Sequence, residues 1–431
     1  MAPKAAKAKS SKLQTVNELG IDPRELTVLQ RRELFTKKRT ELSKDWRVVK
    51  ENETEELVPF NSLTLDHGLR LYGMARNGTV YQFHGDEGAG KSTLAYAVNR
   101  EYQKITQEPV AIFDFERTTK SWYLRAMGID ESMAFVKRPD SIEDAVKNAI
   151  DLMGQGVRLF TFDSIPRMRS KVEVGEIKNG NAFKVQPGTH ARAIQQFYDI
   201  MLPHIAAVDG TLLMINQTRS RIEMTQEAKS AASGYATVTN LDYSLPGGRA
   251  NRYAISGMIE LKTVKAWRPG KLEDPFILEA EAQRGEEYLA NEVRVRTLKN
   301  KVSGTGYREG RIWIRPGLGT DENVSIRQWG RDLKMIANHG PRYFVGNGIE
   351  DAIKVYDSKA AAIEDLVNNP NEEVLGQLKE AIIARMYADN TIGALAVDED
   401  AMRYLAGESD YAADNDNNIP ASLIAESDDE L

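Results

Sequence analysis

The segment Gly85-Asp86-Glu87-Gly88-Ala89-Gly90-Lys91-Ser92 limits what this chain can fold into more than any other feature. It has the spacing G-x-x-x-x-G-K-S and lies between an apolar run at 78–84 and a helix-like stretch at 92–105. In that setting the glycines let backbone N–H groups point at phosphates, at a helix N-terminus that favours anions. We therefore expect these residues and Thr93 to bind ATP, with Lys91 reaching the β- and γ-phosphates and the Ser92 hydroxyl on Mg²⁺. A glycine-rich turn without a ligand is the alternative.

Apolar segments and amphipathic segments alternate on both sides of this loop. Strands are expected at 78–84, 109–116, 158–164 and 211–217, and helices at 92–105, 141–154 and 190–208. Continuously apolar strands that alternate with helices favour a parallel α/β sheet covered on both faces. Further strands are expected at 255–265 and 293–298, followed by a smaller module with helices at 349–356, 359–367 and 374–387.

Composition places the chain among globular proteins of ordinary make-up. Its 431 residues are 41% hydrophobic and 28% charged, and at roughly 100–200 residues per domain they allow two or three domains. The absence of cysteine excludes disulfides and thiolate catalysis, and it suits a reducing compartment, so we expect a cytoplasmic protein. There is no apolar run of the roughly 18 residues that a membrane span needs, and the basic start lacks the apolar core of a secretory signal.

Charge is distributed unevenly between the two ends. Residues 1–12 contain four lysines and no acid, whereas residues 408–431 contain eight acids and no lysine or arginine. Removing those eight negative charges from the net charge of −6 leaves +2 for the rest of the chain. This pattern is typical of a nucleic-acid-binding protein whose acidic tail competes for its own basic surface. Two solubilising, disordered ends are the alternative.

Carboxylates at the ends of two expected strands are candidates for the chemistry. Asp163 ends the strand at 158–164, where an aspartate could hold Mg²⁺ beside the phosphate loop. Glu116 ends the strand at 109–116, where a carboxylate could act as a general base on the attacking water. Asp114 is two residues away on the same strand face and is the main rival for that role.

Several segments, taken in order, resemble the RecA family of recombinases. They are GDEGAGKSTLAYAV, VAIFDFERTTKSWYLRAMGID, RLFTFDS, THARAIQQFYDIMLPHIAAVDGTLLMINQTRSRI, PGGRANRYAIS and RVRTLKNKVSG. The resemblance implies a RecA-like P-loop ATPase core at 59–325, with a mostly parallel central sheet. It further implies an N-terminal helical oligomerisation arm at 21–58 and a small C-terminal α/β module at 326–407. Residues 1–20 and the acidic tail at 408–431 are expected to be disordered.

The resemblance also implies roles for individual residues. Glu116 matches the catalytic glutamate of the family, and Gln217 matches the glutamine that senses the γ-phosphate. Tyr123 matches the aromatic residue that stacks on adenine; the alternative is that Tyr123 is an ordinary core residue. Lys299 and Lys301 match a lysine pair that reaches the neighbouring subunit's ATP, and Arg252 and Tyr253 match a basic–aromatic pair at the same interface. Two polar segments, about 167–189 and 219–252, match the DNA-binding loops, in which the expected contacts are Arg167, Arg169, Arg192 (just beyond the first segment), Arg219, Arg221, Gly247 and Gly248.

Together these features predict an ATP- and Mg²⁺-dependent enzyme with DNA as its partner. The resemblance implies polymerisation on single-stranded DNA, homologous pairing with a duplex, and DNA-dependent ATP hydrolysis, in a bacterial cell or a phage-infected host. The run KNKVSGTG at 299–306 also resembles a turn of hexameric RecA-fold helicases, so a ring-shaped DNA motor is an alternative. A RecA-fold ATPase scaffold that does not bind DNA is a second alternative.

Overall fold

The computed structural model describes residues 57–178, 188–220, 243–267, 275–276, 290–302, 308–315 and 318–388. Every element below belongs to one unit of the chain, Glu56–Leu431. The expected disordered start, almost all of the helical arm and the acidic tail lie outside the described residues. Leu57–Val58, the last two residues of the expected arm, form strand β1, which pairs with β2 (Met74–Ala75).

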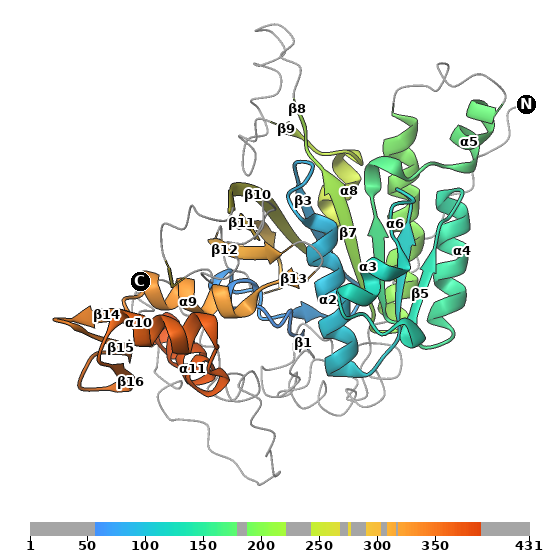
Figure 1. Cartoon of the computed structure of the whole chain (residues 1–431). Helices are drawn as coiled ribbons and strands as arrows, with labels where there is room; N and C mark the ends of the chain where they lie inside the picture. The colour runs from blue at the N-terminus through green and yellow to red at the C-terminus, as the bar shows by residue number, and fades with distance from the viewer. Residues whose placement is uncertain are drawn as a thin grey trace, which may run out of the picture. The chain divides into compact units, whose positions relative to one another are not determined.

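A nine-stranded sheet forms the centre of the fold (Figure 1), and its strand order is β13-β12-β11-β10-β3-β7-β6-β4-β5. The part from β10 to β5 is parallel, and β11, β12 and β13 extend it antiparallel. The fold is therefore α/β with a mostly parallel central sheet, as the sequence predicts. The strands are β3 (Thr79–Gly85), β4 (Val110–Asp114), β5 (Ala134–Lys137), β6 (Leu159–Asp163), β7 (Thr211–Gln217), β10 (Gly257–Trp267), β11 (Ala290–Asn300), β12 (Arg308–Arg315) and β13 (Gly319–Thr320).

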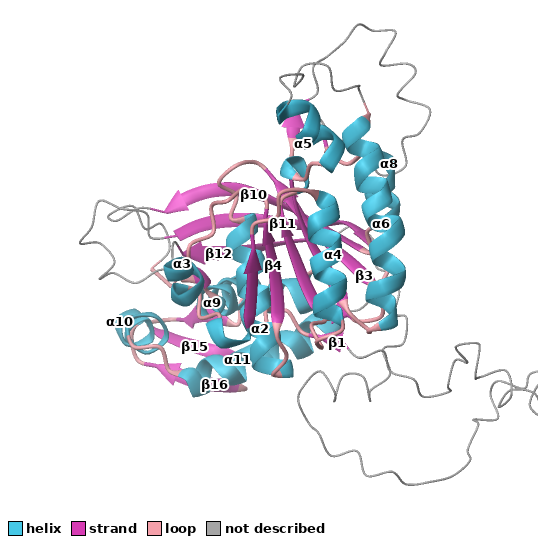
Figure 2. Cartoon of the chain, turned by 90° about the vertical axis from the view of Figure 1, so that its right-hand side faces the viewer, coloured by secondary structure: helices cyan, strands magenta, loops and turns pink. Residues whose placement is uncertain are grey.

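Helices cover both faces of the parallel strands because those strands are apolar on both faces. Every residue of β4 and of β6 is buried. Phe160 and Phe162 of β6 pack with α4 (Ile142–Met153) and α6 (Thr189–Ala207), which lie alongside one another in Figure 2. Leu159 points to the other face and packs in the cluster that contains α2 (Lys91–Thr106). Among the described residues, no helix is long and apolar enough to cross a membrane.

A three-stranded antiparallel sheet with helices follows the central sheet in the chain. It contains β14 (Ile336–His339), β15 (Arg342–Gly346) and β16 (Ala352–Tyr356), next to α10 (Lys359–Ile363) and α11 (Glu372–Ala388). The preceding helix α9 (Glu322–Asp332) runs across the expected boundary at 325–326. The helices predicted at 359–367 and 374–387 are confirmed, the first as α10 with a π-helical turn at 364–368.

The helix predicted at 349–356 is wrong. Residues 349–351 form a turn, and the rest of the segment is β16, in which Tyr356 pairs with Tyr343 of β15 and is buried. A stretch of two helical turns cannot be told from a short strand by its apolar spacing alone. The hydrogen bonds available from β15 decide the matter.

Candidate nucleotide-binding site

The phosphate-binding loop joins β3 to α2, and close contacts explain its glycines. A Cβ on Gly85 would lie 2.0 Å from the carbonyl oxygen of Leu261, and one on Gly90 would lie 2.3 Å from Cδ1 of Ile314. Gly88 and Gly90 also have φ values of 75° and 81°, which L side chains rarely adopt. The backbone contact at Gly85 and the positive φ values at Gly88 and Gly90 therefore favour glycine at these positions.

Lys91 begins α2 and is largely buried at the mouth of the loop. Its Nζ donates a hydrogen bond of 2.6 Å to the main-chain oxygen of Asp86. Burial lowers the pKa of Lys91, whereas the nearby Asp163 and Glu116 carboxylates act in the opposite direction. An ammonium group held by one carbonyl beside a helix N-terminus is suited to a phosphate oxygen.

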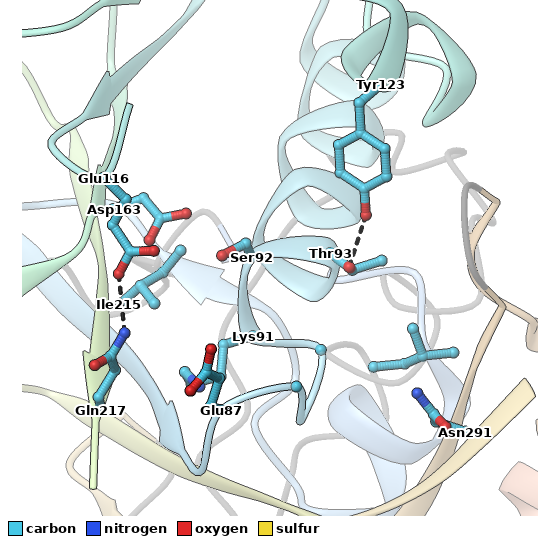
Figure 3. A pocket seen from close by; sticks show the side chains of 13 residues that line it. Glu87, Lys91, Ser92, Thr93, Glu116, Tyr123, Asp163, Ile215, Gln217 and Asn291 are labelled. Atoms are coloured by element: carbon cyan, nitrogen blue, oxygen red, sulfur yellow. Dashed lines mark hydrogen bonds between the residues drawn. The ribbon is translucent and has the colours of Figure 1, made fainter. Parts of the chain in front are cut away.

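A pocket of about 400 Å³ opens beside this loop. In Figure 3, Glu116, Asp163 and Gln217 lie on one side of the pocket, and Tyr123 and Asn291 lie on the other. Sequence reasoning missed three lining residues, Ile215, Asn291 and Ile314, which carry no local motif. The full lining is Glu87, Gly88, Gly90, Lys91, Ser92, Thr93, Glu116, Tyr123, Asp163, Ile215, Gln217, Asn291 and Ile314, so Gly85, Asp86 and Ala89 belong to the loop without lining the pocket.

Asp163 and Ser92 both line the pocket and carry oxygen atoms that can bind a cation. Burial raises the pKa of the Asp163 carboxyl to about 7; the Ser92 side chain lowers it, and the Glu116 and Asp114 carboxylates add to the rise. Oδ1 of Asp163 is buried and has no hydrogen-bond partner among the described residues. A hydroxyl and a free carboxylate oxygen are hard ligands of the kind that Mg²⁺ takes beside substrate phosphates, so these residues fit that ion.

Glu116 and Asp114 differ sharply in what surrounds them. Glu116 lines the pocket, where its Oε1 accepts hydrogen bonds from Ser164 Oγ at 2.6 Å and from Gln217 Nε2 at 2.9 Å. Asp114 is fully buried and accepts from the backbone N–H groups of Thr118 and Thr119, at 3.3 and 2.9 Å. Asp114 therefore holds the turn after β4, and only Glu116 faces the pocket.

Tyr123 lies on the short helix α3 (Ser121–Ala126) on the opposite side of the pocket. Its hydroxyl is 2.8 Å from Thr93 Oγ1, and its ring meets Trp122 edge to face at 5.8 Å. The tyrosine ring is only half-buried, which leaves part of it available to a planar ligand group. Asn291 of β11 lies on this side too and offers an amide for hydrogen bonding.

Lys299 and Lys301 do not line the pocket of their own chain. Lys299 Nζ donates to the main-chain oxygen of Arg252, and Lys301 Nζ donates to that of Tyr253 at 3.3 Å. Burial, with a smaller effect of Lys301, lowers the pKa of Lys299 to about 8. Both lysines thus meet the last turn of α8 (Gly248–Ala254), and Tyr253 is 75% exposed there.

The first polar segment, 167–189, contains a helix that sequence reasoning missed. Residues 171–178 form α5, and Ser170 and Glu173 close its start reciprocally. Glu173 Oε2 accepts from the Ser170 N–H at 2.9 Å, and Ser170 Oγ accepts from the Glu173 N–H at 3.3 Å. This capping box was readable from the spacing S-x-x-E. Arg167 and Arg169 are exposed just before it, and 179–187 lies outside the described residues.

The second polar segment, 219–252, is closed at its base. Arg219–Ser220 (β8) pairs with Tyr243–Ser244 (β9), while residues 221–242, which include Arg221, lie outside the described part. Gly247 and Gly248 have positive φ and start α8 against α6, where a Cβ on Gly248 would lie 3.0 Å from Cβ of Ala191. Arg192 is exposed on that same turn of α6, so it lies close to the glycine pair.

Comparisons with known proteins agree with this architecture. The family model described as the RecA N-terminal domain matches residues 46–242. "Protein RecA" of Nautilia profundicola is 25% identical over 362 residues, which cover 83% of this chain and 91% of that protein. "Protein RecA" of Azoarcus sp. is 27% identical over 331 residues, which cover 75% and 86%, and that of Deinococcus radiodurans is 24% identical over 336 residues, which cover 78% and 81%. Since the family model matches residues 46–242 and the relatives match most of the chain, this chain belongs to the RecA family.

Proposed function

We propose that this protein is a DNA-dependent ATPase that polymerises on single-stranded DNA and catalyses homologous pairing and strand exchange. Membership of the RecA family implies an ATPase of recombinase-like function, and the finer assignment is ours. The observation that carries it is that Gln217 lines the nucleotide pocket, contacts Glu116 and stands two residues before the second polar segment. One residue therefore lies at the pocket that would hold the nucleotide and also leads directly into the segment that we assign to DNA binding.

The proposed binding step uses the phosphate loop and its lysine. Lys91 Nζ moves from the Asp86 carbonyl to the β- and γ-phosphates, and the loop N–H groups hold the remaining oxygens. Ser92 and Asp163 would hold Mg²⁺, which would supply positive charge to offset that of the phosphates. Tyr123 stacks on the adenine at the other side of the pocket.

The proposed hydrolytic step depends on Glu116. Its carboxylate orients the attacking water and accepts a proton from it, while Ser164 keeps the carboxylate in place through its hydroxyl. Gln217 donates to Glu116 in this structure, and its amide is equally able to donate to a γ-phosphate oxygen. If the Gln217 amide donates to the phosphate instead of to Glu116, the Glu116 carboxylate is free to act as the base. The same change moves Gln217, which leads into the segment 219–252.

Hydrolysis in this proposal requires a second subunit. Lys299 and Lys301 lie away from their own pocket, against α8 with its exposed Tyr253, so we assign them to the ATP of a neighbour in a filament. A cation supplied across an interface stabilises charge on the phosphoryl group in the transition state. ATP turnover would then depend on assembly, with Arg252 and Tyr253 at the contact.

DNA would be held mainly by its backbone. Arg167, Arg169 and Arg192 are exposed cations at the bases of the two polar segments, and Arg219 opens the second. Such contacts fix a strand without reading its sequence and leave the bases free to pair with a homologous duplex. Bacterial cytoplasm, or that of a phage-infected cell, is the compartment in which we expect this activity.

Electron microscopy tests the proposal directly. The full chain is incubated with a slowly hydrolysed ATP analogue, Mg²⁺ and long circular single-stranded DNA. Continuous helical filaments along the DNA are the expected result. Closed six-membered rings would instead support a helicase, the class that the run at 299–306 also resembles. The absence of both filaments and rings would refute both DNA-dependent assignments.

A further inference from the structure

Four fully buried polar side chains form a hydrogen-bonded network beneath the nucleotide pocket. Gln82 of β3, Asn216 of β7, Tyr198 of α6 and Asn251 of α8 are each at most 2% exposed. Figure 1 shows these elements close together at one end of the central sheet. A polar cluster in the core costs free energy unless its groups are paired, so its contacts indicate what it is for.

The network joins the strand that carries Gln217 to the turn that opens α8. Asn216 Oδ1 accepts from the backbone N–H of Gln217 at 2.9 Å, and Asn216 Nδ2 donates to the Pro246 carbonyl at 3.1 Å. The same Nδ2 lies 3.3 Å from Gln82 Oε1. One amide therefore holds both the γ-phosphate side of the pocket and the residue before the Gly247-Gly248 pair.

Asn251 repeats this arrangement from the other side. Its Nδ2 donates to Gln82 Oε1 at 2.8 Å and to the Pro246 carbonyl at 3.3 Å, while its Oδ1 accepts from the Tyr198 hydroxyl at 2.7 Å. Gln82 Oε1 is thus the acceptor shared by both asparagines. A shift of β7 at Asn216 must change the hydrogen bonds of α8, because the two elements compete for the same two oxygens.

One donor of the network is left unsatisfied in this arrangement. Gln82 Nε2 is buried and has no hydrogen-bond partner among the described residues. A buried donor without a partner is costly, so any second arrangement that paired it would recover that cost. Two arrangements of one packed network are what is needed to transmit a displacement between two sites.

We propose that Gln82, Asn216 and Asn251 are positioning residues that couple nucleotide binding at Gln217 to DNA binding at the Pro246–Gly248 turn. This inference rests on the proposed function. It adds a path of coupling between the nucleotide pocket and the DNA site that does not run along the DNA-binding segment itself. Since coupling between two sites is reciprocal, the network must affect DNA affinity and nucleotide affinity by the same factor.

The test compares Gln82→Met, which removes the shared acceptor at similar volume, with Gln82→Glu, which retains an acceptor oxygen. For each full-length variant, the affinity for a fluorescent single-stranded oligonucleotide is measured with and without a slowly hydrolysed ATP analogue. The affinity for the analogue is measured with and without DNA. We expect Gln82→Met to reduce the coupling factor about fivefold or more in both directions, and Gln82→Glu to retain it.

Controls separate coupling from stability and from the proposed function. Asn99→Met alters another fully buried amide, which hydrogen-bonds Ala95 and Thr161 on α2 and β6, and it should leave the coupling factor unchanged. If Gln82→Met does not fold, Tyr198→Phe, which removes only the hydroxyl donated to Asn251, must lower the factor instead.

Equal coupling in wild type, Gln82→Met and Tyr198→Phe would overturn the inference, as would an equal loss in Gln82→Met and Gln82→Glu. A wild-type protein whose DNA affinity does not respond to nucleotide would refute the proposed function itself.

Discussion

Asp163 makes Mg²⁺-nucleotide binding dependent on pH, in a direction that its environment determines. Burial raises the pKa of this carboxyl to about 7, so near neutral pH the nucleotide-free protein is a mixture of protonated and charged forms. The protonated form is favoured in the folded chain. The protonated carboxyl therefore contributes its full share to the free energy of unfolding at pH values below the usual carboxylate pKa. This share is lost as the pH rises through about 7. Only the charged form is a good ligand for Mg²⁺.

The size of the effect follows from that pKa. At pH 6 about nine in ten molecules carry a proton on Asp163, and at pH 8 only about one in ten does. The affinity for ATP in excess Mg²⁺ should therefore rise about tenfold from pH 6 to pH 8. Calorimetric titration with a slowly hydrolysed analogue at several pH values measures this rise.

The matched control is the same series of titrations in EDTA instead of Mg²⁺. Protonation of the nucleotide itself affects the titrations with Mg²⁺ and those with EDTA alike, so the difference between them reports on the metal site. Without Mg²⁺ the charged carboxylate repels the phosphates, so the affinity should not rise with pH through the Asp163 side chain. Asp163→Asn should lose the difference between the two series. The same pH dependence with and without Mg²⁺ in the wild-type protein would refute the reasoning.

Four further predictions concern the proposed cycle. Glu116→Gln should retain ATP binding but lower turnover by about 10²- to 10⁴-fold in a DNA-stimulated ATPase assay, and wild-type turnover would remove Glu116 as the base. Lys91→Ala should abolish nucleotide-dependent DNA binding in a filter-binding assay, and normal strand exchange by this variant would contradict the phosphate-site assignment. Arg219→Ala should weaken DNA binding, measured by fluorescence anisotropy, while ATP affinity is unchanged; an unaltered DNA affinity would exclude this residue from the DNA path. Deletion of 408–431 should strengthen DNA binding most at low salt, since a tail with eight acids competes with phosphates, and a salt-independent or absent effect would leave the tail as a solubilising segment.

Local chemistry explains the parts of the site that could be predicted. The phosphate loop is a contiguous motif, and its strand and helix are adjacent in the chain, so Lys91 and Ser92 could be assigned without knowledge of the fold. Asp163 could be assigned because carboxyl ends of parallel strands meet at one edge of a sheet. The capping box of Ser170 and Glu173 was equally local and was overlooked.

The local strand pattern does not decide between Glu116 and Asp114, although the resemblance to the RecA family favours Glu116. Both carboxylates follow one apolar run, and their two-residue spacing puts them on one face of an ideal strand. The strand ends at Asp114, however, and the turn after it uses the Asp114 carboxylate to bind two N–H groups, which leaves Glu116 to face the pocket. Where a strand stops is set by its hydrogen-bonded neighbours, and these come from elsewhere in the chain.

The sequence by itself determined the α/β class, six of the strands of the central sheet and the position of the phosphate loop, because each depends on residues close together in the chain, but it missed β5, β12 and β13. Only the tertiary structure brought Asn291 and Ile314 to the pocket and Lys299 and Lys301 to the end of α8, since the sheet pairs strands that lie far apart in the sequence. It alone also revealed the buried network around Gln82. A hydrogen bond between β3 and α8 joins residues separated by 169 positions, and no pattern of local spacing encodes such a contact.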